Sequence, residues 1–198
     1  ILKEKFINWM NPQPNTQLVD VASGTGDIAK LFHFRTNKSS NITCIEPNNE
    51  MFRKGKDKLK KFENITWINT VAEKIPIEDN TFDYYSISFG LRNVSNINQA
   101  LKEAFRILKP GGRFMCLEFS KVENEILDYL YKQYSKAIPY VGKLVVGSDK
   151  PYKYLVESIK KFHNQQELAK FISNNGFSNV EFRNLSNGIS AIHSGWKI

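Results

Sequence analysis

Eight residues near the start of the chain, from Asp20 to Asp27, combine two glycines with two acidic side chains. They follow an apolar run and precede a helical pattern, so a strand is expected to turn into a helix here. Gly24 and Gly26 leave room for a ligand to contact the backbone. Asp27 places a negative charge at the mouth of the turn, where it would repel a phosphate and attract an amine or a sulfonium cation. The turn therefore predicts a nucleoside ligand with a positive charge at its reactive end.

A further carboxylate, Glu46, ends the next apolar strand pattern, twenty residues after Gly26. A carboxylate at that place can accept hydrogen bonds from both hydroxyls of a ribose. The run from Gly24 to Ala29 also satisfies the looser fingerprint of dinucleotide-binding loops, so an NAD-linked dehydrogenase is a rival interpretation. The charge of Asp27 and the lack of a convincing acid–base pair for hydride transfer count against that rival.

Two later motifs extend the pattern. Val71 and Ala72 follow the third predicted strand and offer a small side chain and backbone amides against which an adenine could lie. The run from Pro110 to Gly112 precedes the fifth predicted strand. Each motif alone is typical of an ordinary turn. The order and spacing of all the motifs together are much less readily explained by chance.

In this order the motifs resemble those of class I S-adenosylmethionine-dependent methyltransferases. Four longer stretches are similar to the ubiquinone/menaquinone biosynthesis C-methyltransferase family, found in bacteria and mitochondria. They are Ile87-Ser-Phe-Gly-Leu-Arg-Asn-Val94, Cys116-Leu-Glu-Phe-Ser120, Tyr152 to Ile159 and Gly188 to Lys197, and Phe89-Gly-Leu-Arg-Asn93 is the most specific part. The similarity extends from about Gln17 to the end of the chain. The family usually has an aspartate where this chain has Glu46, and the longer side chain should keep the ribose bond with a shifted geometry.

The resemblance implies an α/β, Rossmann-like fold: a seven-stranded, mostly parallel sheet with an antiparallel last strand and helices on both faces. It implies S-adenosyl-L-methionine as cofactor. Its methionine end would lie on the glycine turn, its ribose on Glu46 and its adenine on the loop after the third strand. The residues expected to contact the cofactor are Gly24, Thr25, Gly26, Asp27, Glu46, Val71, Ala72 and Ser88.

The resemblance also implies the acceptor, a polyprenyl-benzoquinol of the 2-methoxy-6-polyprenyl-1,4-benzoquinol type that is methylated on a ring carbon in ubiquinone biosynthesis. Arg92 is expected to stabilise the quinolate oxygen, because a guanidinium cannot serve as a simple base, and Asn93 is expected to orient the same oxygen. The alternatives are a demethylmenaquinol methyltransferase, another class I small-molecule methyltransferase, and a non-catalytic cofactor-binding module.

Strand-like and helical patterns alternate along the chain, and repeated β-then-α units predict a mostly parallel sheet covered on both faces. Strands are predicted at residues 18–22, 42–46, 65–69, 82–88, 113–119, 180–184 and 189–194, the last two joined by a hairpin at Asn187-Gly188. Helices are predicted at residues 27–34, from a cap at Asn48 to about Phe62, from a cap at Asn96 or Ser95 to Leu108, and at residues 165–174.

Residues 120–163 are predicted to form a helical insertion within a single domain spanning residues 1–198. An apolar stripe at Ile126, Leu130, Tyr134 and Ile138 fits either a helix packed on the sheet or a lid over the polyprenyl tail. The chain opens on Ile1 in the middle of a pattern, and the helices that precede this domain in the family are expected to be nearly all missing.

The net charge of +8 is typical of a solvated, lysine-rich surface or of one that contacts an anionic membrane. Nucleic acid binding is disfavoured, because the lysines between residues 53 and 61 are not interleaved with aromatic residues. Cys44 and Cys116 are expected to be buried hydrophobes, the three histidines to be structural, and no metal site is predicted. The expected setting is the mitochondrial matrix with peripheral contact to the inner membrane, or else the bacterial cytoplasm. The partners expected are a polyprenyl quinol substrate and either a second copy of the chain, in a homodimer, or a quinone-biosynthesis complex.

Overall fold

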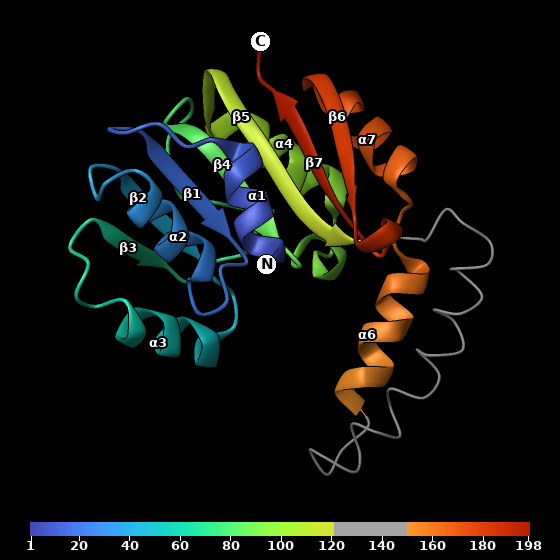
Figure 1. The fold of residues 1–198 in the computed structure, drawn as a ribbon, viewed down its shortest axis with the longest axis horizontal. Helices are drawn as coiled ribbons and strands as arrows, with labels where there is room; N and C mark the ends of the chain where they lie inside the picture. Colours follow the sequence, from blue (N-terminus) through green and yellow to red (C-terminus); the bar gives the residue numbers. More distant parts are fainter. Residues whose placement is uncertain (121–149) are drawn as a thin grey trace.

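A seven-stranded sheet forms the centre of the computed structural model, which describes residues 1–120 and 150–198 (Figure 1). The strand order is β3-β2-β1-β4-β5-β7-β6. β7 runs antiparallel to both of its neighbours, and the other neighbouring strands are parallel. This confirms the predicted α/β sheet with an antiparallel last strand. The strands are β1 (Gln17–Val21), β2 (Asn41–Ile45), β3 (Ile65–Ile68), β4 (Phe82–Ser88), β5 (Leu108–Phe119), β6 (Ser178–Leu185) and β7 (Ser190–Trp196).

Most strand positions follow from apolar runs, since a strand covered on both faces is almost continuously apolar. β4 has the predicted bounds, and its central residues are buried. β5 differs, because it begins at Leu108 rather than at Arg113. Leu108 already pairs with Phe82, and the register then shifts before Arg113 pairs with Tyr84. Gly111, at a φ of 79°, turns the chain within this irregularity.

The helices described are α1 (Leu2–Met10), α2 (Asp27–Arg35), α3 (Asn49–Lys58), α4 (Ile97–Ile107), α6 (Lys150–Lys161) and α7 (Gln165–Asn174), with short 3-10 turns η1 (Leu91–Asn93) and η2 (Ser186–Gly188). The Asn48 side chain caps α3 as predicted, accepting from the amides of Glu50 and Met51 at 3.0 Å. Asn96, rather than Ser95, caps α4. α3 ends before the predicted Phe62, because the chain turns so that the Phe62 ring lies 4.6 Å from that of His33.

Two apolar cores cover the two faces of the sheet. In Figure 1, α1 and α2 lie in front of the sheet and α4 lies behind it. The first core joins β4 and β5 to the apolar faces of α4 and α7. The second joins β1 and β2 to α1 and α2, and it includes Phe6, Ile7 and Met10 of α1, a helix that no pattern in the sequence predicts.

Buried polar and sulfur-containing side chains take structural places in these cores. Cys44 and Cys116 are fully buried, and burial raises the pKa of both thiols. His193 is buried with its Nε2 atom 2.9 Å from the Gln165 carbonyl oxygen, and burial lowers its pKa to about 4. Across residues 1–120 and 150–198, every helix is too short or too polar to cross a lipid bilayer. The stripe from Ile126 to Ile138 lies outside the described residues.

Candidate active site

The predicted site residues gather at the carboxyl ends of β1, β2 and β4. β1 pairs with β2 on one side and β4 on the other, so the strand order reverses between β1 and β4. Open α/β sheets bind their ligands at such a switch point. The glycine turn follows β1, Glu46 follows β2, and Ser88 ends β4, which brings residues far apart in the sequence to one edge of the sheet.

The two glycines of the turn have different structural roles. Both have positive φ, 58° at Gly24 and 78° at Gly26. A Cβ atom added at Gly24 would have no neighbour within 4 Å, so the backbone there faces open space that a ligand could enter. A Cβ atom at Gly26 would lie 2.5 Å from Leu59 and 3.1 Å from the Trp67 ring. The expectation that both glycines leave room for a ligand therefore fits Gly24, whereas Gly26 also allows α2 to pack closely on its neighbours.

Glu46 joins two loops of the site. Its Oε2 atom accepts a hydrogen bond from the Gly24 amide at 2.8 Å, and its Oε1 atom accepts one from the Asn48 amide at 2.9 Å. The side chain is almost fully buried. Each carboxylate oxygen has a second lone pair, so these bonds leave acceptor capacity for ribose hydroxyls. The ribose contact stays a prediction. In the structure the longer glutamate side chain also holds the two loops together.

Asp27 lies among lysines. Its Oδ2 atom lies 2.7 Å from Lys3 Nζ and its Oδ1 atom lies 2.6 Å from Lys58 Nζ. These hydrogen bonds lower its pKa to about 2. Lys58 also donates to Thr25 Oγ1 at 3.2 Å. The sequence predicts a negative charge that attracts a cationic ligand, but in the structure two lysines compensate this charge. Asp27 therefore ties α1 and α3 to the start of α2, and its contact with a cofactor stays a prediction.

Asp20 lies beneath the turn, and the sequence pattern does not identify it as a site residue. Its side chain is buried, and its Oδ1 atom accepts a hydrogen bond from Ser86 Oγ at 2.7 Å. Its Oδ2 atom has no partner among the described residues. Burial disfavours the charged form and raises the pKa of Asp20 to about 7. The carboxyl group below the glycine turn thus titrates near neutral pH.

The loop after β3 is held in place from the side of α4. The Glu73 carboxylate accepts from the amides of Ser95 at 2.9 Å and Asn96 at 3.1 Å. Ala72 is buried, whereas Val71 is 45% exposed. This placement offers an apolar side chain at the surface of a fixed loop, as an adenine ring would require. The two predicted adenine contacts are thus compatible with the loop and stay predictions.

Arg92 is held by Glu118, a buried carboxylate at the end of β5 that is not among the predicted site residues. Arg92 Nη1 donates to Glu118 Oε1 at 2.6 Å and to the Phe89 carbonyl oxygen at 2.6 Å. Glu118 Oε2 accepts from the Arg92 amide at 3.2 Å, and the Phe119 ring lies 5.3 Å from the guanidinium carbon. The Glu118 side chain is 1% exposed, and burial raises its pKa. A charged residue inside the apolar run of residues 114–119 is the sequence signal that could have identified it.

One edge of the Arg92 guanidinium is left without a protein partner. Its Nε atom is buried and has no hydrogen-bond partner among the described residues, and the same holds for the hydroxyl oxygens of Ser88 and Ser120. Unpaired buried polar atoms are rare in proteins and call for a ligand or a water molecule. The edge of a guanidinium that carries Nε binds oxygen atoms bidentately, so this edge fits an anionic oxygen.

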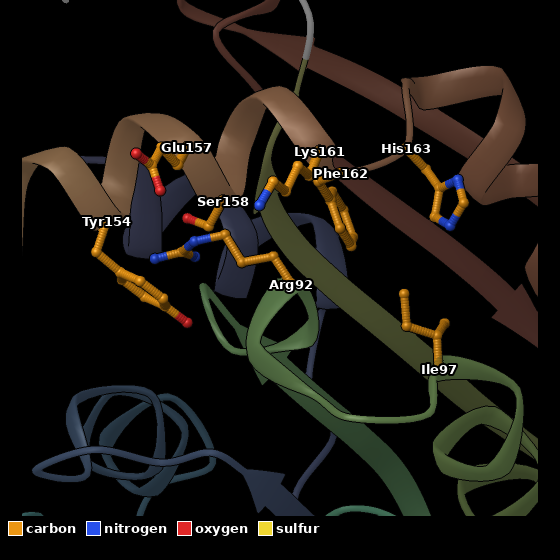
Figure 2. A pocket seen from close by; sticks show the side chains of 8 residues that line it. All are labelled: Arg92, Ile97, Tyr154, Glu157, Ser158, Lys161, Phe162 and His163. Atoms are coloured by element: carbon orange, nitrogen blue, oxygen red, sulfur yellow. The ribbon is translucent and has the colours of Figure 1, made fainter.

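A pocket of about 280 Å³ lies between η1 and α6, where Arg92 extends along the underside of the helix toward Tyr154 (Figure 2). The Tyr154 hydroxyl donates to Asn93 Oδ1 at 2.9 Å, so both predicted catalytic residues lie at or next to this pocket. Among residues 1–120 and 150–198, no group of three His, Cys, Asp or Glu side chains could hold a metal ion. The pocket is lined by Arg92, Ile97, Tyr154, Glu157, Ser158, Lys161, Phe162 and His163.

Solved structures share this fold at low sequence identity. A SAM-dependent methyltransferase from Aquifex aeolicus superposes with a TM-score of 0.73 and 18% identity, over 99% of this chain and 89% of that one. The [4+2]-cyclase SpnF superposes with a TM-score of 0.75 and 17% identity, over 99% and 80%. These similarities confirm the Rossmann-like architecture, and the cyclase shows that the architecture alone does not fix the reaction.

Closer relatives are found by sequence. The ubiquinone/menaquinone biosynthesis C-methyltransferase UbiE of Brucella abortus (strain S19) is 45% identical over 204 residues, which cover 100% of this chain and 76% of that protein. Its counterpart in Brucella anthropi is 46% identical over 100% of this chain and 78% of that protein. The sequence profile of the ubiE/COQ5 methyltransferase family matches residues 1–197. The predicted methyltransferase is thereby confirmed, and the chain belongs to the ubiE/COQ5 methyltransferase family.

Proposed function

We propose that this protein transfers a methyl group from S-adenosyl-L-methionine to a ring carbon of a polyprenyl-benzoquinol of the 2-methoxy-6-polyprenyl-1,4-benzoquinol type, in ubiquinone biosynthesis. The new carbon–carbon bond replaces the ring C–H bond, so the products are the methylated quinol, S-adenosyl-L-homocysteine and one proton. The observation that carries the proposal is the buried guanidinium of Arg92, which has an unpaired edge beside Asn93. The Brucella relatives, named for ubiquinone and menaquinone biosynthesis, support the same substrate class.

The turn and its surrounding loops fit the cofactor. Gly24 presents open backbone, Ser88 presents a buried hydroxyl without a partner among the described residues, and Val71 presents an apolar side chain. When bound, S-adenosyl-L-methionine supplies an activated methyl group on a sulfonium. Glu46 fixes the loop that holds Gly24, so the turn is arranged before a ligand arrives.

Arg92 and Asn93 would act on the acceptor. A quinol carbon becomes a strong nucleophile when a ring hydroxyl is ionised, so donors aimed at that oxygen lower the barrier. The free edge of Arg92 supplies such donors in a largely buried place, where their effect is greater than in water. Glu118 supports this role by holding the other edge of the guanidinium. Positioning and exclusion of water would supply most of the remaining rate enhancement.

Turnover with a demethylated quinol is the test of this function. The purified protein should convert a short-chain 2-methoxy-6-prenyl-benzoquinol into its C-methylated product, and should bind S-adenosylmethionine but not NAD. Arg92→Lys keeps a cation beside Glu118 but removes the planar fork, so kcat should fall at least about tenfold with little change in cofactor affinity. Arg53→Lys, at an exposed position on α3, is the matched control. Unchanged turnover in Arg92→Lys would refute the role of Arg92.

The same assay separates the alternatives. A demethylated naphthoquinol tested in parallel reports whether menaquinone precursors are also methylated. Absence of turnover with either quinol, despite binding of S-adenosylmethionine, would favour a non-catalytic cofactor-binding module.

We also propose peripheral contact with an anionic membrane, where a polyprenyl substrate would reside. The net charge of +8 supports it. Flotation with anionic liposomes should show binding that weakens with salt, and no binding would count against it. The relatives named above are bacterial, so they favour the bacterial cytoplasm over the mitochondrial matrix.

A further inference from the structure

The Tyr154 hydroxyl group contacts the oxygen end of the Asn93 amide. Its hydroxyl group donates a hydrogen bond to Asn93 Oδ1 at 2.9 Å. An asparagine side chain carries one acceptor oxygen and one donor NH2 group, and either can face a ligand when nothing holds it. The bond from Tyr154 occupies the oxygen. Among the described residues, no protein partner is found for the Asn93 Nδ2 group, so the amide presents a donor.

Arg92 beside it also presents only donors. The Nη1 atom of Arg92 is bonded to Glu118 and to the Phe89 carbonyl oxygen, while its buried Nε atom is unpaired. Two neighbouring residues of η1 therefore offer N–H groups and no acceptor. Such a pair stabilises an oxygen that carries negative charge more than a neutral hydroxyl group, which must also donate its own proton.

Tyr154 lies on a different element from Arg92 and Asn93. It lies on α6, while Arg92 and Asn93 lie on η1, and Figure 2 shows Tyr154 on the same helix as the pocket residues Glu157, Ser158 and Lys161. The Tyr154 side chain is 57% exposed. Its hydroxyl group is therefore not needed to fill the core. Loss of that single oxygen leaves the apolar packing of α6 intact.

We propose that Tyr154 is a positioning residue that turns the Asn93 amide so that its NH2 group donates to an ionised phenolic oxygen of the acceptor. The proposal rests on the proposed function and deepens it, because it specifies that the site prefers a phenolate to a phenol. Charged groups at the pocket bear on this preference in both directions. Arg92 and Lys161 favour a bound anion, whereas Glu157 and the Glu118 carboxylate paired with Arg92 oppose it. The His163 imidazole also lines the pocket.

The first test is a double-mutant cycle. Tyr154→Phe should lower kcat about tenfold without changing S-adenosylmethionine affinity or the midpoint of unfolding. In an Asn93→Ala background the same change should have no further effect, because its target is gone. Asn93→Asp keeps the acceptor for Tyr154 and removes the donor, so it should lower kcat by more than tenfold. Tyr84→Phe is the matched control, since the Tyr84 hydroxyl also bonds a carbonyl oxygen, that of Asn11.

A second measurement does not require turnover. 4-Nitrophenol absorbs differently as phenol and as phenolate, so its spectrum reports the ionisation of the bound probe. The wild-type protein should bind the phenolate form, with an apparent pKa below that of the free probe, and Tyr154→Phe should shift that pKa upward. An unaltered pKa, or an effect of Tyr154→Phe that persists in Asn93→Ala, would overturn the proposal. A probe shift without methyl transfer to any quinol would instead refute the proposed function while supporting the preference of the site for a phenolate.

Discussion

The carboxyl group of Asp20 makes the stability of the protein depend on pH in a direction that can be measured. Asp20 is fully buried below the glycine turn, with one hydrogen bond from Ser86. Burial raises its pKa from 3.8 to about 7. The folded protein therefore keeps a proton that the unfolded chain has already released at pH 5 or 6. Protons bound only by the folded state make its stability fall as the pH rises.

The size of the effect follows from the two pKa values. Each unit of difference corresponds to about 1.4 kcal/mol, so a shift from 3.8 to about 7 corresponds to about 4 kcal/mol. The free energy of unfolding should therefore fall by about this amount between pH 4 and pH 7, and this contribution should be constant at higher pH. The variant Asp20→Asn carries no titrating proton at this position and keeps an acceptor for Ser86.

Urea unfolding followed by tryptophan fluorescence between pH 4 and pH 8 measures this contribution. The stability of Asp20→Asn relative to the wild type should increase across that range by about 4 kcal/mol, because only the wild type must lose a buried proton. Asp57→Asn, at an exposed position paired with Lys60, is the control and should show the slope of the wild type. Equal slopes for the wild type and Asp20→Asn would refute the assignment of the buried proton to Asp20.

The two glycines of the turn and the paired carboxylates of Glu118 and Asp27 lead to further predictions. Gly26→Ala should destabilise by about 2 kcal/mol, from its positive φ and the contact with Leu59, and leave cofactor affinity less affected than stability. Gly24→Ala should lower the free energy of unfolding by about 1 kcal/mol and weaken S-adenosylmethionine binding measured by calorimetry. Weaker cofactor binding in Gly26→Ala than in Gly24→Ala would contradict the structure. Glu118→Gln should lower kcat about tenfold and the free energy of unfolding by about 2 kcal/mol. An unchanged kcat in this variant would refute the role of Glu118 in positioning Arg92. Asp27→Asn, half-exposed, should cost about 1 kcal/mol at low salt and less at high salt, and a salt-independent cost would rule out the ion pairs as its origin.

The sheet could be predicted because its strands are buried on both faces and its turns use residues with strong conformational preferences. The hairpin at Asn187-Gly188 is an example, since both residues adopt positive φ there. The caps at Asn48 and Asn96 follow from side-chain chemistry that acts within three residues. By contrast, α1 has nine residues and no capping side chain, so its place depends on tertiary contacts that no local pattern records.

The electrostatics of the site could not be predicted for the same reason. The partners of Asp27 lie 24 and 31 residues away in the sequence, on α1 and α3. The partner of Arg92, Glu118, lies 26 residues away. Sequence spacing places each charge on an element, but only packing decides which charges meet. A residue whose charge is expected to meet a ligand, such as Asp27, can therefore be paired with other side chains in the fold.

The place of β7 in the sheet has a consequence for the order of folding. β7 follows every other strand in the sequence, yet it lies between β5 and β6. Until β7 inserts, β5 and β6 have no partner along the edges that β7 will occupy, so each exposes an unpaired edge. Such edges can pair with other chains. We expect aggregation during synthesis or refolding to begin at these two edges, and a mutation that slows insertion of β7 to reduce the yield of folded protein without touching the active site.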